Sequence, residues 1–216
     1  MESKIKTIVK TNALQELPGF ISGNLGKILL VADRNTYSAA GERVGGILRE
    51  SGLPYQEIIF KSQILVPDEH GLAEIQAKIG PDIGLLLAVG SGTITDLTRF
   101  ASFKSSKPFI AIPTAPSMDG YASPVAALTL KGFKQTLPAA PPLAIIADIE
   151  IIKQAPPVMI QAGLGDLFGK YTALADWELG RIIEDEDYSP LIADQVRTVV
   201  DRAVHSFTMI FPPKKK

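Results

Sequence analysis

The stretch IGLLLAVGSGTITDLTRFASF occupies residues 83–103 and decides the fold. Its first eight residues are almost wholly apolar, which is the pattern of a parallel strand that is buried on both faces. A glycine-containing turn follows, and from Ile94 onward apolar residues recur at helical spacing. A strand, a glycine turn and a helix in this order predict one strand–helix unit of an α/β protein.

Similar units lie on both sides of this stretch. Strands are expected over residues 27–33, 55–60 and 108–114, and helices over residues 37–51 and 68–79. Parallel strands that are joined by helices form an open sheet with helices on both faces. We therefore expect an α/β fold with a Rossmann-like, doubly wound nucleotide-binding domain.

The pattern changes after Ser123. The segments VAALTL and KGFKQTL predict a two-stranded excursion with its turn at Lys131 and Gly132, and residues 143–148 predict a last strand. Beyond it the chain becomes helical. We expect residues 1–150 to form the nucleotide-binding domain and residues 151–216 to begin an all-helical domain, which is too short to close a core of its own.

Composition excludes several classes of function. The 22 Lys and Arg residues balance 23 Asp and Glu residues, which argues against binding to nucleic acid or to an anionic membrane. The absence of cysteine excludes disulfides and thiolate metal sites. No apolar run is long enough to span a membrane, and the first residues lack the pattern of a signal peptide. We expect a soluble cytoplasmic protein with a small-molecule ligand. Whether it forms a homo-oligomer is left open by the sequence.

The first motif with chemical potential is VGSGTITD, residues 89–96. Gly90 and Gly92 would let the backbone approach a phosphate, and the N-terminus of the following helix would offer it free N–H groups. The spacing matches neither the full dinucleotide fingerprint nor a P-loop. A glycine turn without any ligand is the alternative.

The second motif is IPTAPSMDGYASP, residues 112–124, which follows a strand. Its hydroxyl groups could bind phosphate, ribose or amide groups, and Asp119 could bind a substrate hydroxyl. An ordinary loop in which Asp119 caps a turn is equally compatible with the residues. Asp33, at the end of an earlier strand, could bind a ribose hydroxyl or cap a helix, and the adjacent Arg34 leaves NAD and NADP both open.

The third motif is GLGDLFGK, residues 163–170. Its acid, Asp166, could be a metal ligand, a catalytic acid or an N-terminal helix charge, and the residues alone favour the capping role. Neither His70 nor His205 has a partner at metal-binding spacing, so both are interpreted as non-ligands. Trp177 is expected to lie in a core rather than against a cofactor.

Taken in order, VGSGTITD, PTAPSMDGYASPVA and GLGDLFGKYTALADWE resemble the glycerol-1-phosphate dehydrogenase branch of the iron-containing alcohol dehydrogenase and dehydroquinate synthase-like superfamily. The resemblance covers about residues 5 to 205. It implies a nucleotide-binding domain, a helical domain and a divalent metal, zinc, nickel or iron, in the cleft between them. It also implies NAD or NADP as cofactor and a small phosphate ester as substrate.

The resemblance assigns roles to individual positions. Asp119 would bind substrate, and Asp166 would be both a metal ligand and a catalytic, substrate-binding acid, which reverses the preference for a cap. The residues expected to contact the cofactor are Asp33, Gly90, Gly92, Thr93, Ile94, Thr95, Asp96, Thr114, Ala115, Pro116, Ser117 and Ser123.

The implied activity is the reduction of dihydroxyacetone phosphate to sn-glycerol 1-phosphate, a step of phospholipid biosynthesis. Family members complete the metal site with two histidines far beyond the position of Asp166, and His205 lies too close to match either. The sequence is therefore expected to be truncated at its C-terminal side. A catalytically inactive dinucleotide-binding fragment, a glycerol dehydrogenase-like polyol oxidoreductase, and an α/β protein that binds another phosphate ligand such as a nucleotide sugar are the alternatives.

Overall fold

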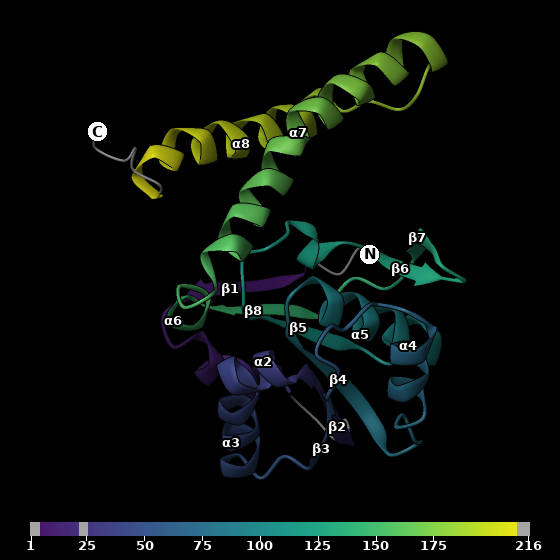
Figure 1. The fold of residues 1–216 in the computed structure, drawn as a ribbon, viewed down its shortest axis with the longest axis vertical. Coiled ribbons are helices and arrows are strands. Elements are labelled where there is room, and N and C mark those ends of the chain that lie inside the picture. The colour runs from purple at the N-terminus through teal and green to yellow at the C-terminus, as the bar shows by residue number, and fades with distance from the viewer. Residues whose placement is uncertain (1–4, 22–25, 211–216) are drawn as a thin grey trace. The chain divides into compact units, whose positions relative to one another are not determined.

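The computed structural model describes residues 5–21 and 26–210, and it divides the chain into two compact units (Figure 1). The sheet unit extends to Pro116 and continues over Gly120–Pro156. The helical unit consists of Ser117–Asp119 and the residues from Pro157 onward. The roles predicted for the two parts of the chain, with a boundary near residue 150, stay predictions.

The sheet unit is built on six parallel strands in the order β1-β8-β5-β4-β2-β3. They are β1 (Lys6–Lys10), β2 (Lys27–Asp33), β3 (Tyr55–Phe60), β4 (Ile83–Gly90), β5 (Phe109–Pro113) and β8 (Ala144–Asp148). The predicted α/β fold is confirmed. Strand β1 is an addition that the sequence pattern did not predict, because an edge strand with lysine at both ends is mostly exposed and lacks an apolar run.

Helices cover both faces of this sheet (Figure 1). Along β4, Leu85 and Leu87 belong to the core cluster that includes α3 (Glu42–Glu50), whereas Leu86 and Ala88 belong to the cluster that includes α4 (Glu69–Gln76) and α5 (Gly92–Ser105). Successive side chains of a strand point to opposite faces, so a strand covered on both sides must be apolar throughout. This explains the unbroken apolar run of β4.

The helices after β2 and β3 begin at aspartates. Asp33 accepts a hydrogen bond from the Thr36 backbone N–H (2.9 Å), and this capping box starts α2 (Arg34–Thr36), which continues through a π-helical turn, Tyr37–Gly41, into α3. The helical segment therefore begins three residues before the predicted start at Tyr37. Asp68 caps α4, which ends at Gln76 rather than at the predicted Ile79.

The predicted excursion is an antiparallel hairpin of β6 (Val125–Leu130) and β7 (Phe133–Pro138). Both turn residues have positive φ, 52° at Lys131 and 79° at Gly132, as a two-residue type I′ turn requires. The Thr129 N–H donates to the Pro67 carbonyl (2.8 Å), which attaches the hairpin to the chain before α4. The remaining short elements are η1 (Ala13–Glu16), α1 (Leu17–Phe20), η3 (Gly120–Ala122) and α6 (Ile149–Ile152).

The helical unit is a hairpin of α7 (Pro157–Glu184) and α8 (Pro190–Ile210). The Trp177 indole N–H donates to the Asp187 carbonyl (2.8 Å), and its ring lies 4.6 Å from that of Tyr188. Trp177 packs at the connection between the two helices. It is only partly buried and is not a core residue. Within the residues that the structure describes, no helix combines the length and the apolar character needed to cross a membrane.

Asp166 lies inside α7, and this corrects the interpretation of GLGDLFGK as a helix start. The helix begins at Pro157, where the missing N–H of proline costs no hydrogen bond because the first turn has no acceptor for it. The glycines around Asp166 do not interrupt the helix. Asp166 consequently projects from a helix that has already formed and does not cap its end.

Candidate functional site

The carboxyl ends of the parallel strands bring two of the predicted motifs together in the sheet unit. The strand order reverses at β2, because the chain runs from β2 to β3 on one side of it and then crosses from β3 to β4 on its other side. Asp33 and Gly90 end these two adjacent strands, and the Thr114 N–H after β5 donates to the Gly90 carbonyl (3.3 Å). Ligands of open α/β sheets bind at such a reversal point.

The turn from β4 into α5 leaves a helix N-terminus without a side-chain cap. Ser91 has extended backbone angles, φ −94° and ψ −155°, and its side chain makes no capping hydrogen bond. The first intrahelical bond is donated by the Thr95 N–H to the Ser91 carbonyl (3.0 Å). The N–H groups of the first turn before Thr95 therefore lack acceptors within the helix, and together with the helix dipole they can bind an anion.

Glycine occupies positions 90 and 92 of this turn for different physical reasons. A Cβ at Gly90 would lie 2.6 Å from the Cβ of Ile94, so packing between strand and helix alone requires glycine there. Gly92 and Thr93 are partly exposed, as a ligand contact needs. Ile94 and Thr95 are buried, so a cofactor contact at these two positions would have to come from backbone atoms.

Arg99, which the sequence analysis did not single out, is a buried cation bonded to the end of the second motif. Its side chain is 1% exposed, and its Nη1 lies 2.6 Å from Oδ1 of Asp96. The guanidinium also donates to three backbone carbonyls, those of Gly120 (2.7 Å), Tyr121 (2.9 Å) and Val125 (3.0 Å). Burial raises the pKa of Asp96, which Arg99 opposes, and burial lowers the pKa of Arg99. An arginine within the mostly apolar stretch LTRFA, three residues after an acid, was the available signal.

The second motif forms a closed loop. The Tyr121 hydroxyl donates to the Ala115 carbonyl (2.7 Å), so both ends of the loop are held together. Residues 116–117 are partly exposed and Ala115 is buried. The Ser123 hydroxyl oxygen accepts a hydrogen bond from the Val125 N–H (3.1 Å), which leaves its own proton to donate to a ligand.

The predicted substrate-binding acids meet within the helical unit. The Asp119 backbone N–H donates to Oδ2 of Asp166 (2.9 Å), and Nζ of Lys170 lies 2.9 Å from Oδ2 of Asp119. Lys170 follows Asp166 by one helical turn of α7, so both lie on one face of the helix. The sequence analysis did not single out Lys170. A cavity of about 280 Å³ next to these residues is lined by Asp119, Leu167, Lys170, Gln195, Val196, Val199 and Val200.

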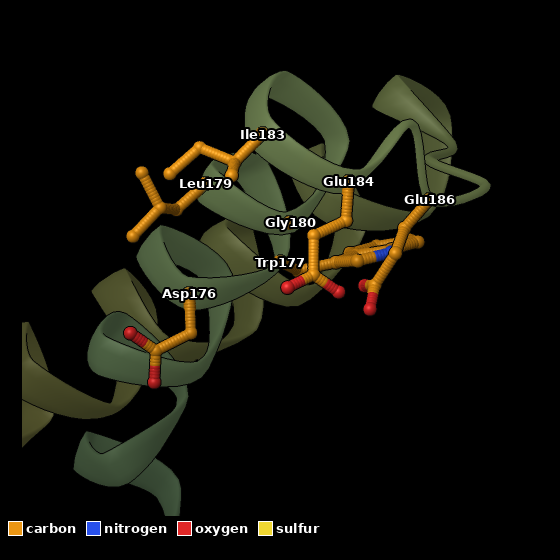
Figure 2. Close-up of a pocket in the computed structure, with 7 residues that line it drawn as sticks. All are labelled: Asp176, Trp177, Leu179, Gly180, Ile183, Glu184 and Glu186. Carbon is orange, nitrogen blue, oxygen red and sulfur yellow. The ribbon is translucent and has the colours of Figure 1, made fainter.

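A larger pocket of about 530 Å³ lies near the end of α7 (Figure 2). Leu179 and Ile183 point to one side of it, and Glu184 and Glu186 lie on the other (Figure 2). None of the predicted site residues lines this pocket. The predicted site residues therefore give this pocket no role.

Residues 8–156 match the family model described as iron-containing alcohol dehydrogenase. The chain belongs to the iron-containing alcohol dehydrogenase family. This confirms the resemblance that the three motifs indicate.

Curated relatives of the chain are named glycerol-1-phosphate dehydrogenase (NAD(P)+). The protein from Halalkalibacterium halodurans is 40% identical over 193 residues, which cover 88% of this chain and 48% of the relative. The protein from Bacillus licheniformis is 37% identical over 203 residues, which cover 92% and 51%. The chain thus spans about half the length of these curated relatives.

A solved structure supports the fold. The probable glycerol dehydrogenase from Sinorhizobium meliloti 1021 matches with a TM-score of 0.80 at 17% identity, over 94% of this chain and 56% of that chain. At this identity the likeness concerns the fold alone.

The metal that gives the iron-containing alcohol dehydrogenase family its name does not fit the residues described. Catalytic metal sites usually take about three protein ligands. Over residues 5–21 and 26–210, no three His, Asp or Glu side chains lie close enough together to hold an ion. The N–H of Asp119 bonds to one oxygen of Asp166, and His70 and His205 are both exposed. Asp166 stays a predicted ligand, and no chemical step through a metal follows from these residues.

Proposed function

We propose that this chain binds NAD or NADP at the first turn of α5, as the nucleotide-binding part of a glycerol-1-phosphate dehydrogenase-type oxidoreductase. The observation that carries the proposal is the uncapped N-terminus of α5 at the reversal point of the sheet. A dinucleotide diphosphate is an anion that suits such a helix end. The names of the curated relatives support the same cofactor.

Each partly exposed group would bind a different part of the cofactor. Backbone N–H groups of Gly92 and Thr93 would bind the diphosphate, and the Ser123 hydroxyl of the same unit would bind a sugar or amide group. The capping bond of Asp33 engages Oδ1, so a ribose hydroxyl would be bound through Oδ2. When bound, the nicotinamide supplies or accepts a hydride, and the protein's part is to orient it.

For the family-type enzyme we propose the reduction of dihydroxyacetone phosphate to sn-glycerol 1-phosphate. Asp119 is held by Lys170 through its carboxylate and bonded to Asp166 through its backbone N–H, so it is oriented to accept a hydrogen bond from a substrate hydroxyl. Lys170 also brings a positive charge near a phosphorylated substrate. This arrangement supports a small phosphorylated polyol or ketone as the substrate class.

A second candidate function is dinucleotide binding without turnover. It is favoured by the absence, among the described residues, of a group of three metal-ligating side chains. Both candidates require the same nucleotide site, so the test of that site comes first.

The test is calorimetric titration of NADH into the wild-type chain, Gly92→Val and Gly46→Val. A valine at position 92 would fill the volume that the diphosphate needs, and we expect at least about a hundredfold weaker binding, which is about 2.7 kcal/mol. Gly46 lies in α3, where an added Cβ meets no atom within 4 Å, so Gly46→Val is the matched control.

Unchanged NADH affinity in a folded Gly92→Val chain would remove the α5 turn from the site. An equal loss in both variants would trace the effect to helix stability. Parallel titrations with ATP and a nucleotide sugar test whether the site prefers another phosphate ligand.

A further inference from the structure

Arg99 is the most voluminous of the fully buried side chains that the structure describes. A buried guanidinium is costly unless its charge is paired and its N–H groups are bonded. Asp96 supplies the charge partner, and three backbone carbonyls accept the remaining Nη hydrogen bonds. Nε is buried and has no partner. The buried guanidinium of Arg99 therefore uses most of its hydrogen bonds to hold backbone carbonyls of the sheet unit.

The three carbonyls belong to one segment, Gly120–Val125, which carries Ser123. A guanidinium is a planar fork with fixed donor directions, so acceptors that bind it are fixed relative to each other and to its helix. The Asp96–Arg99 pair therefore joins α5 to the whole segment that enters β6.

We propose that Arg99 is a positioning residue for the dinucleotide, which holds segment 120–125 against α5. The inference rests on the proposed function, because α5 would bind the diphosphate with its first turn and Ser123 would bind the cofactor from the segment. Arg99 touches neither ligand group directly. It keeps the two groups at a constant separation, so that both can bind one cofactor without the loss of entropy that ordering the segment would require.

Hydrogen–deuterium exchange tests the positioning itself. Segment 120–125 is compared in the wild-type chain, Arg99→Met, Arg99→Lys and Leu97→Ala. In Arg99→Met we expect its amides to exchange at least about tenfold faster, with unchanged exchange in β4 and β5. Arg99→Lys should give an intermediate rate, because an ammonium donates from one point and cannot reach all three carbonyls.

Leu97→Ala is the matched control. Leu97 is fully buried in the same helix but has no hydrogen bond to the segment, so its loss should destabilise α5 without a selective effect on residues 120–125. Equal exchange of the segment in Arg99→Met and wild type would overturn the inference. A uniform rise over the sheet in both variants would do the same. If Arg99→Met does not fold, the Arg99→Lys comparison carries the test.

NADH titration of the same variants tests the link to the cofactor. We expect about tenfold weaker binding for Arg99→Met and no more than about twofold for Leu97→Ala at an equal loss of Tm. Faster exchange of the segment with unchanged NADH affinity would overturn the role in cofactor binding. If the wild-type chain binds no NADH, the proposed function fails, and so does the role of Arg99 in cofactor binding, whereas the exchange data still decide whether Arg99 positions the segment.

Discussion

A side chain at position 90 would collide with the helix that follows β4. The added Cβ would lie 2.6 Å from Cβ and 2.8 Å from Cγ1 of Ile94, whose side chain is buried and cannot move aside freely. We therefore expect Gly90→Ala to lower the free energy of unfolding by about 1–3 kcal/mol, the usual cost of overpacking. Urea unfolding followed by circular dichroism measures this loss.

Gly46→Ala is the control for this prediction. Position 46 lies within α3 and has open space for a Cβ, so alanine should raise the free energy of unfolding by roughly 0.5–1 kcal/mol through helix propensity. Opposite signs at the two glycines are the expected result. A neutral Gly90→Ala would show that the turn can relax and that packing against Ile94 does not require glycine there.

Among the elements, α4 depends on a single N-terminal cap. One carboxylate oxygen of Asp68 accepts hydrogen bonds from the backbone N–H groups of His70 and Gly71, both at 3.0 Å. In Asp68→Ala these two groups lose their acceptor, and we expect about 1 kcal/mol lower stability. Glu74→Ala, an exposed change on the same helix, should shift the unfolding midpoint by much less. Equal shifts in the two variants would argue against the cap.

For the whole molecule we expect NADH binding without metal-dependent turnover. The residues of the proposed nucleotide site lie in the described chain, whereas no three described side chains form a metal site. Without a Lewis acid, the transition state loses several kcal/mol of stabilisation. Because about 1.4 kcal/mol corresponds to a tenfold change in rate, the reaction would be slower by several orders of magnitude.

The measurement is NADH oxidation with dihydroxyacetone phosphate and added zinc, nickel or iron, with a chelated sample as control. Turnover that appears only with metal would contradict the expectation and would show that further ligands reach Asp166 from elsewhere, for instance from a second copy of the chain.

Local patterns in the sequence determined much of this architecture. Strand β4 and its glycine turn, the helix after it, and the two-residue hairpin turn at Lys131–Gly132 were all predicted, and the order of three motifs indicated the family. These features depend on burial periodicity and on backbone angles of neighbouring residues, which a chain expresses within a few positions.

Tertiary structure alone decided which distant groups meet. Strand β1 pairs with β8, with Lys6 opposite Ala144, although nothing in the five residues of β1 indicates which strand it pairs with. The bonds from Arg99 to the carbonyls of residues 120–125 and from the Asp119 N–H to Asp166 likewise join segments far apart in the chain. A buried guanidinium or a backbone N–H can donate to any acceptor of suitable geometry. Only the packing of the whole core determines which acceptor it meets.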